Sequence, residues 1–442
     1  TTGEIAVACG ENAESTQSAE RRETEMRRTI EYEVDLAVIG GGLAGLCAAV
    51  QAARLGCKVL LMQDRPMPGG NASSEVRMWP RGCLGRDLQE TGLIEELFCE
   101  NMWRNPTRNY SLWDSVMYGM ARNEPNLTML LNTTCIDGER ELVGHLPLPP
   151  QFGRGETALL PGVGTGADLL VAAETDPSPI PQYRLVSVTG WQLTTYSYHR
   201  VKARYFADCS GDSVLAELSG ALYRVGREAA DEFNEDLAPP RADRKTMGNS
   251  IILNARETDR SSTFEPPTWA EKYSDESRFN HRDHDMHEPT LNYWWIELGG
   301  DRDSLADAED LRDELLAATL GVWDHIKNHG ADSVVTSVAC TTSGTAATVG
   351  ENAETSAPAC VTRENAATRG EIAENAPDPG ASAADPLAIH NADKFELDWL
   401  GFLPGKRESR RYVGPLTLTQ SDLQEPRCFP DEISHGGWPL DD

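Results

Sequence analysis

The sequence predicts an α/β fold in which a parallel sheet is flanked by helices, joined to a second domain of α+β type. Three observations carry this prediction. A glycine-rich turn separates a strand-like apolar run from an Ala- and Leu-rich run, a second glycine pair follows the next strand-like run, and a later apolar run ends in Ser-Gly-Asp. In open α/β sheets, turns of this kind gather at the carboxyl ends of the strands, where ligands bind.

The first glycine turn lies inside a strand–helix–strand unit. Apolar runs at 34–39 and 59–62 predict two strands. The run at 46–55 predicts a buried helix, and Gly56 is suited to end it because glycine readily takes a left-handed conformation. A unit of this size and order is typical of a crossover between parallel strands.

Three glycines of this unit, Gly40, Gly42 and Gly45, fit the pattern G-x-G-x-x-G. The first permits a tight turn, the second lets a pyrophosphate approach the backbone, and the third lets the helix pack on the strand. The N-terminus of the helix also favours an anion, because its N–H groups are free and its dipole is positive. The turn therefore predicts a dinucleotide site; the alternative is a unit whose glycines serve only close packing.

The residue that contacts the ribose is open. A dinucleotide fold usually places Asp or Glu at the end of the second strand. Here Gln63 holds that position and Asp64 follows it. The Gln63 amide can both accept and donate, so either residue can face the ribose. Arg65 is close enough to leave a 2′-phosphate as an alternative.

A second polar turn with two glycines follows in the stretch DRPMPGGNASSE. Its candidate ligand-binding residues are Arg65, Gly69, Gly70, Asn71, Ser73 and Ser74. A nicotinamide-only fold does not need this second turn. A longer ligand does, because its second phosphate and its polyol chain run on past the first turn.

From this turn onward the chain resembles the FAD-dependent oxidoreductases of the glutathione-reductase-like flavoprotein superfamily. More narrowly, it is similar to a bacterial group of such proteins with a GGNASSE turn. Stretches such as YFADCSGDSVLAELSGALYRVG and LDWLGFLPGKRESRRYVG look like that group and occur in its order. The resemblance implies a Rossmann-like FAD-binding domain, FAD as cofactor and an oxidoreductase activity.

The resemblance also implies cofactor contacts farther along the chain. The main chain of Cys135, in a strand expected at 130–135, would meet the adenine; otherwise Cys135 is a small buried residue. Asp208, Gly211 and Asp212 form a turn that would lie beside the flavin dinucleotide, with the acids accepting from sugar hydroxyls. The alternative is an ordinary polar turn.

Three arginines are the candidate catalytic residues. Arg407 and Arg410 belong to the cationic stretch GKRESRR, and Arg77 follows the second glycine turn. A guanidinium can clamp a carboxylate or stabilise an anionic reduced flavin. The alternative for GKRESRR is a set of internal salt bridges, for example to Glu408. Aromatic side chains that could stack on a ring, but are more often core, are Trp79, Trp294 and Trp295.

We predict no metal site. His281, His284 and His287 alternate with acidic residues, but they match no recognised ligand pattern, and a solvated loop is the preferred interpretation. Ten cysteines occur without any Cys-x-x-Cys pair, which suits reduced thiols and a cytoplasmic protein.

Composition limits the partners. The net charge of −30, from 40 basic and 70 acidic residues, disfavours nucleic acid and anionic membrane surfaces. No apolar run approaches the roughly 20 residues of a transmembrane helix, and no signal peptide is visible. We expect a small-molecule substrate, an electron acceptor that the sequence does not identify, and neither nucleic acid nor a membrane as partner.

The predicted organisation combines these parts with two tracts of low complexity. No Phe, Trp or Tyr occurs between Asp324 and Lys394, so that region cannot bury enough apolar surface to offset chain entropy. We expect a low-complexity tract at 1–30, an FAD-binding domain at 31–143 and 182–232 with a Gly/Pro-rich insertion at 144–181, and a cap domain at 233–330 and 385–442 with a low-complexity insertion at 331–384.

The predicted function is hydride transfer between a small polar organic substrate and the N5 atom of the flavin. An NAD-dependent dehydrogenase is one alternative, although it leaves the second and third turns unexplained. A truncated, non-catalytic flavoprotein-like protein is another. The resemblance implies a further strand and helix after GGWPLDD, so we expect that the chain lacks its final FAD-binding segment.

Overall fold

The computed structural model describes residues 28–78, 80, 91–146, 180–273, 292–293, 296–329, 392–414, 416–424 and 429–430. Most of the two low-complexity tracts and of the Gly/Pro-rich insertion falls outside these ranges, as do Trp79, Trp294, Trp295 and the three histidines of the polar loop. The stretch GGWPLDD at 436–442, after which we expect a missing segment, lies outside these ranges too. The expectations on those residues stay predictions.

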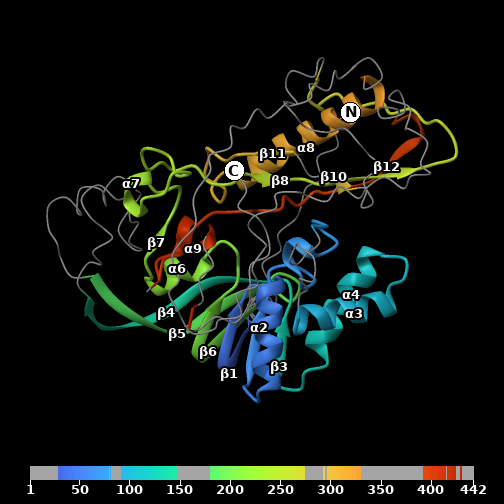
Figure 1. The fold of residues 1–442 in the computed structure, drawn as a ribbon. Coiled ribbons are helices and arrows are strands. Elements are labelled where there is room, and N and C mark those ends of the chain that lie inside the picture. Colours follow the sequence, from blue (N-terminus) through green and yellow to red (C-terminus); the bar gives the residue numbers. More distant parts are fainter. Residues whose placement is uncertain are drawn as a thin grey trace, which may run out of the picture.

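A six-stranded sheet forms the lower half of the molecule (Figure 1), in the order β3-β2-β1-β6-β5-β4. Its strands are β1 (Thr29–Ile39), β2 (Val59–Met62), β3 (Leu127–Leu130), β4 (Thr133–Leu146), β5 (Ile180–Gln192) and β6 (Ser197–Asp208). The first three and β6 run parallel, while β5 is antiparallel to both β6 and β4. The predicted α/β fold with a Rossmann-like, mainly parallel sheet is confirmed.

The predicted unit around the first glycine turn is present as strand, helix and strand. The helix α2 (Leu43–Arg54) follows β1 and is followed by β2. Gly56, with φ +94°, comes directly after the helix cap, as expected. The strand expected at 130–135 is wrong in its bounds, because Asn132 takes a positive φ of 51° and splits it between β3 and β4.

The strand β2 is buried on both faces. Along β2, Leu60 and Met62 pack into one cluster, while Val59 and Leu61 pack into the cluster on the opposite face. The alternation follows from the two-residue period of a strand. One face is covered by α2, and α3 (Leu93–Arg104) and α4 (Tyr110–Arg122) pack against α2 in a further cluster.

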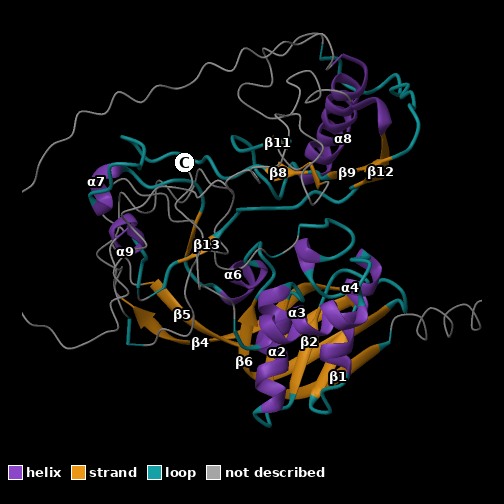
Figure 2. Ribbon diagram, turned by 45° about the vertical axis from the view of Figure 1, so that its right-hand side comes forward, coloured by secondary structure: helices purple, strands orange, loops and turns teal. Residues whose placement is uncertain are grey.

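The upper half of the molecule holds a second, separate apolar cluster (Figure 2). It is formed by residues of α8 (Ala308–Asp324), β9 (Leu253–Glu257) and β12 (Phe395–Leu400), and β9 pairs with both β12 and β10 (Asn292–Tyr293) in a three-stranded sheet. The fully buried Trp323 lies at its centre. This second core fits the predicted cap, although the exact domain boundaries stay a prediction.

The remaining described elements are short. They are η1 (Gly70–Ala72), α6 (Val214–Ser219), β7 (Tyr223–Arg224), α7 (Ala230–Phe233), β8 (Asn249–Ser250), β11 (Glu297–Leu298), η3 (His325–His329), η4 (Ala392–Lys394), β13 (Arg411–Tyr412) and α9 (Gln420–Gln424). Within the described ranges, no helix combines the length and apolar character needed to cross a membrane. No cluster of three His, Cys, Asp or Glu side chains there is arranged to hold a metal ion.

Candidate cofactor-binding site

Each glycine of the first turn has a distinct role in the structure. Gly40 has φ +97°, and a Cβ there would lie 2.3 Å from the carbonyl oxygen of Cys209. A Cβ on Gly45 would lie 1.9 Å from the carbonyl oxygen of Gly40, so this glycine lets α2 pack on the turn. A Cβ on Gly42 would meet only the Cα of Gly70, at 4.0 Å. The middle glycine therefore faces open space, where a ligand can approach the backbone.

The two glycine turns lie side by side. The N–H of Gly69 donates to the carbonyl of Gly41 at 2.7 Å, and Gly42 and Gly69 form a parallel bridge. A Cβ on Gly70 would lie 3.0 Å from the Cα of Gly42, so only glycine allows this approach. The sequence places these turns almost thirty residues apart, and the fold brings them into one surface at the carboxyl ends of β1 and β2.

This surface fits the diphosphate of FAD. The N-terminus of α2 begins at Gly42 with no side-chain cap and no acidic residue in its first turn, which leaves its positive end for an anion. Arg65 adds a cation: its Nη1 is buried and has no hydrogen-bond partner among the described residues. A buried, unpaired donor is costly, and a phosphate oxygen would satisfy it.

The side chain of Gln63 is hydrogen-bonded to the first turn. Its Oε1 accepts from the N–H of Gly41 at 2.5 Å, and its side chain is 3% exposed. Asp64, next along the chain, is exposed. The geometry therefore favours Asp64 over Gln63 as the residue that faces the ribose, and it gives Gln63 the task of holding the glycine turn.

The polar residues of the second turn divide between two tasks. Asn71 donates to the carbonyl of Lys406 at 2.8 Å and so ties this turn to the C-terminal part of the chain. Ser73 is fully buried, and its hydroxyl accepts from the N–H of Glu75 at 3.4 Å. A direct contact of Ser73 with a cofactor would therefore require a rearrangement. Ser74 is partly exposed and can reach a ligand.

Helix α4 supports the second turn, which the sequence patterns did not predict. Asp114 accepts from the N–H of Ser74 at 2.9 Å, and the indole of Trp113 donates to the carbonyl of Ala72 at 2.9 Å. Met117 packs against Gly69, where a Cβ would lie 2.4 Å from its Cε. Burial raises the pKa of Asp114, while its hydrogen bonds with Ser74 oppose that shift. The only sequence signal was the run LWDSVM, whose partners lie some forty residues upstream.

Glu75 is a second acid that the sequence patterns did not single out. Its Oε2 is buried without a hydrogen-bond partner in the described part of the chain. Burial raises the pKa of Glu75, and the nearby Arg65 guanidinium opposes that shift. The pair Arg65 and Glu75 thus lies at the second turn with unsatisfied polar atoms on both side chains.

The third turn packs against the first. Asp208 uses both carboxylate oxygens internally: it accepts from Ser210, from the N–H of Leu215 at 2.7 Å and from the hydroxyl of Tyr412 at 2.6 Å. Gly211 has φ +79° and no heavy atom within 4 Å of its Cβ position, so its backbone is open to a ligand. The predicted contact of Asp208 with a sugar hydroxyl stays a prediction, and its observed role is to shape this turn.

The two remaining candidates are Asp212, which belongs to this turn, and Cys135, which lies in β4. Asp212 forms an ion pair with Lys406 at 2.7 Å and accepts from the hydroxyl of Ser409 at 3.2 Å. Cys135 lies in β4 opposite Gly190 of β5. Burial raises the pKa of the Cys135 thiol to about 12, so its side chain stays neutral and its predicted adenine contact would involve the main chain.

Arg77 links the two halves of the molecule. Its guanidinium stacks between Tyr110 of α4 and Trp399 of β12, at 4.5 and 4.0 Å from the ring centroids, and donates to Asn254 of β9 at 3.0 Å. Burial lowers the pKa of Arg77. Its φ of 64° is rare for a residue with a Cβ. This setting gives Arg77 a positioning role between sheet and cap, and its predicted catalytic role stays a prediction.

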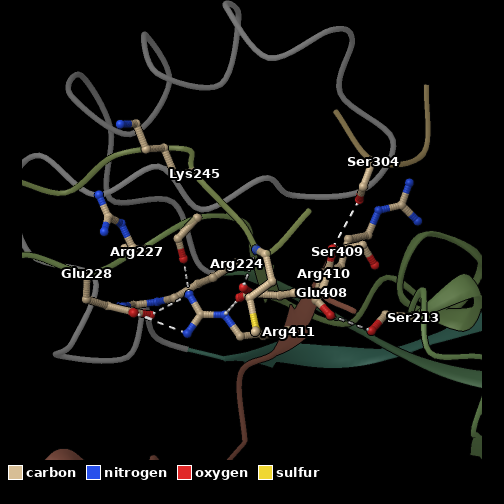
Figure 3. Close-up of polar contacts among 12 residues, drawn as sticks. Ser213, Arg224, Arg227, Glu228, Lys245, Ser304, Glu408, Ser409, Arg410 and Arg411 are labelled. Carbon is tan, nitrogen blue, oxygen red and sulfur yellow. Dashed lines mark hydrogen bonds and ion pairs between the residues drawn. The ribbon is translucent and has the colours of Figure 1, made fainter. Parts of the chain in front are cut away.

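The cationic side chains of the stretch 406–411 form ion pairs with several different carboxylates. Arg407 pairs with Glu297, and Arg410 pairs with Glu217 at 2.9 Å. Figure 3 shows Arg411 directed toward Glu228 and Glu408, which lie 2.9 and 3.3 Å from its guanidinium. The predicted alternative of internal salt bridges therefore describes this stretch. Arg407 and Arg410 do not form one fork, and their catalytic role stays a prediction.

Comparisons with known proteins place the sequence in a family. The model of the family described as FAD dependent oxidoreductase matches residues 35–145 and 163–442. One of the subunits of an opine oxidase from Agrobacterium tumefaciens (strain Ach5) is 32% identical over 120 residues, which cover 24% of this chain and 23% of that protein. This chain thus aligns with about a quarter of that relative's length.

Two solved structures are similar over part of the chain. THI4 of Thermovibrio ammonificans is 18% identical, with 52% of this chain and 81% of that chain covered and a TM-score of 0.27. The flavin-dependent monooxygenase PieE, solved in complex with FAD and substrate, is 12% identical, with 51% and 35% covered and a TM-score of 0.26.

The family match spans far more than half of the chain and includes all three glycine turns. Its cofactor, FAD, fits the surface that these turns form. The chain belongs to the FAD-dependent oxidoreductase family.

Proposed function

We propose that this protein oxidises a small polar organic substrate by transferring a hydride to FAD. When bound, FAD accepts the two electrons and the hydrogen of a substrate C–H bond at N5. The substrate also releases a proton from its oxygen or nitrogen, and an external acceptor must remove the two electrons to complete the cycle. The observation that carries the proposal is the contact between the turns at 40–42 and 69–70, which creates one anion-binding surface.

In this proposal the chain binds the cofactor in sections. The backbone at Gly42 and Gly70 approaches the diphosphate, and Arg65 supplies a cation to it. Asp64 accepts from the adenosine ribose, and the main chain at Cys135 meets the adenine. The open backbone at Gly211 borders the polyol side. These assignments rest on the exposure and hydrogen bonds described above.

The cap shields the reactive end. Arg77 ties the second glycine turn to β9 and β12, so the loop next to the cofactor is fixed against the cap sheet. Exclusion of water strengthens electrostatic interactions at a reacting centre. In this proposal a small polar substrate binds between the sheet-bearing half and the cap. The substrate would meet the cofactor at that place.

The test is to purify the full chain and titrate it with FAD. We expect flavin fluorescence to be quenched as FAD binds, and anaerobic addition of sugars or small organic acids to bleach the flavin bands. Gly42→Leu should abolish binding, whereas the control Leu55→Ala, at an exposed site on the far side of α2, should leave it unchanged. Binding of FAD without bleaching by any substrate would favour the non-catalytic alternative, and tight binding of NAD in place of FAD would contradict the proposal.

A further inference from the structure

A cavity with a volume of about 270 Å³ opens beside the cationic stretch. Its wall includes Tyr223 and Glu217 from the sheet side, the loop 301–305 before α8, and the segment 409–410. At roughly 30 Å³ per molecule, this volume corresponds to about nine waters, which suits a small metabolite.

The cavity adjoins the cofactor-binding surface. Ser409 donates to Asp212 at 3.2 Å, and Ser213 donates to the carbonyl of Arg410 at 3.0 Å (Figure 3). The wall segment 409–410 is therefore fixed directly to the third turn. On the other side, Ser304 donates to the carbonyl of Glu408 at 3.1 Å, which joins the cap loop to the same segment.

Three of the six charged side chains in the wall are held in ion pairs. Arg410 pairs with Glu217, and Arg302 pairs with Glu314 at 2.8 Å. Asp303 accepts from the N–H groups of Leu305 and Ala306 at 2.9 and 3.0 Å. The ion-paired groups shape the cavity. The hydrogen bonds from the backbone and the nearby Arg244 guanidinium lower the pKa of Asp303, so its carboxylate stays charged beside Arg244.

Three polar groups of the wall have no hydrogen-bond or ion-pair partner among the described residues. Arg244 and Asp301 are exposed at the mouth of the cavity, and neither forms a hydrogen bond or an ion pair with other residues that the structure describes. The hydroxyl of Thr246 is buried and lacks a partner within the same ranges. One cation, one carboxylate and one hydroxyl are thus available to a ligand in a small space.

We propose that this cavity binds a small hydroxy- or amino-carboxylic acid, with Arg244 holding the carboxylate and Asp301 accepting from the hydroxyl or ammonium group. A guanidinium holds a carboxylate with two parallel hydrogen bonds. In a chain with a net charge of −30, an anion needs such a local cation. Because the cavity adjoins the third turn, the acid bound there would be the substrate. This role of the acid rests on the proposed function.

The test measures acid binding to the full chain by calorimetry at saturating FAD. The probes are L-lactate, L-alanine and L-malate, each compared with the analogue that lacks the hydroxyl or amino group, namely propionate or succinate. We expect at least one hydroxy or amino acid to bind at least about tenfold more tightly than its analogue. Arg244→Met should weaken that binding about 10- to 100-fold, since hydrogen bonds to charged groups are strong. Arg244→Lys should restore part of it, and Asp301→Asn should reduce the preference over the analogue.

Lys245→Met is the matched control. It removes the same charge from the neighbouring exposed residue, which does not line the cavity, so binding should change less than about twofold. The proposal is overturned if no probe binds, if the two Met variants weaken binding equally, or if FAD and the acid compete for one site.

The test separates this inference from the proposed function. Flavin that is bleached by acids to the same extent in Arg244→Met and in the original chain would overturn the inference and leave the proposed function standing. Acid binding that depends on Arg244 in a chain that never binds FAD would support the cavity assignment and contradict the proposed function.

Discussion

Gly42 and Gly45 differ in the space around them, although the sequence pattern treats them alike. Gly42 has φ −61° and ψ 179°, a conformation that alanine adopts without strain, and its Cβ position is open. Gly45 has no such room, because the carbonyl oxygen of Gly40 lies 1.9 Å from its Cβ position. Gly42 is therefore open to a ligand, as proposed above, whereas Gly45 serves the fold.

We expect Gly42→Ala to leave the free energy of unfolding within about 1 kcal/mol and to weaken FAD binding at least tenfold, because the methyl group occupies the space of the diphosphate. Gly45→Ala should instead destabilise the protein by about 1–3 kcal/mol through overpacking. Urea unfolding and fluorescence titration of FAD check both. Equal loss of stability in the two variants would contradict the separate roles.

The buried thiol of Cys135 gives a prediction on pH. Its folded pKa of about 12 lies above the value of roughly 8.5 of an unfolded thiol. The folded state therefore keeps a proton that the unfolded state releases, so this contribution to stability is complete below the unfolded pKa and is lost as pH rises toward the folded one. Between pH 8 and pH 9.5 the thiol should reduce the free energy of unfolding by about 1 kcal/mol. The Cys135→Ala variant lacks the thiol, so its free energy of unfolding should fall by about 1 kcal/mol less than that of the original chain over the same range. Iodoacetamide should also alkylate exposed Cys99 before Cys135; the reverse order would exclude this assignment.

At the residue scale, the sequence predicted what is local and missed what depends on distant partners. The glycine roles follow from spacing alone, since the turn, the helix start and the strand are neighbours in the chain. Gln63 was left open because nothing in the sequence tells that its amide turns back to Gly41. The partners of Arg77 lie on α4, β9 and β12, so its stacked position could not be read from the residues around it.

At the scale of elements, α4 sets the position of the second glycine turn through two hydrogen bonds and one packing contact. Asp114 and Trp113 are adjacent in the helix and bind the turn at Ser74 and Ala72. The N-cap of this helix is Asn109, whose side chain accepts from the N–H groups of Ser111 and Leu112. A well-capped helix that packs on α2 can therefore hold the turn in place without touching the ligand.

Asp114→Ala should weaken FAD binding about three- to tenfold and cost about 1–3 kcal/mol of stability, because the N–H of Ser74 loses its acceptor. Asp114→Asn keeps an oxygen at the same place and should restore most of both. Fluorescence titration gives the affinity and urea unfolding gives the stability. If Asn and Ala behave alike, the acceptor at position 114 does not position the turn.

At the scale of the molecule, the sequence predicted a sheet-bearing part and a cap, and the separation of the apolar cluster in the upper half from those around the sheet fits that division. It did not predict how they are joined. Arg77, Asn71 and Ser304 each connect segments more than a hundred residues apart. Such contacts depend on the relative placement of both halves, for which local patterns carry no information.

The two chain segments that flank the second low-complexity tract meet at Lys327. Its buried ammonium donates to the carbonyls of Ala392, Asp393 and Phe395 at 2.6, 2.8 and 2.6 Å and to the hydroxyl of Ser262 at 3.1 Å. Burial lowers the pKa of Lys327. These bonds hold the end of η3 against the start of β12, so the chain leaves and re-enters the cap at nearly the same place.

A linker of about eight Gly and Ser residues in place of residues 330–391 should therefore preserve the cap. Eight residues span up to roughly 26 Å, more than two ends held by one lysine side chain require. Shortening the loop also lowers its closure entropy, which should stabilise the protein by up to about 2 kcal/mol. Lys327→Met should cost about 1–3 kcal/mol in either background, because it removes the hydrogen bonds that a buried ammonium donates to three backbone carbonyls. Thermal unfolding measures both effects; a linker variant that fails to fold, while Lys327→Met is tolerated, would show that the replaced segment and not the lysine holds the cap together.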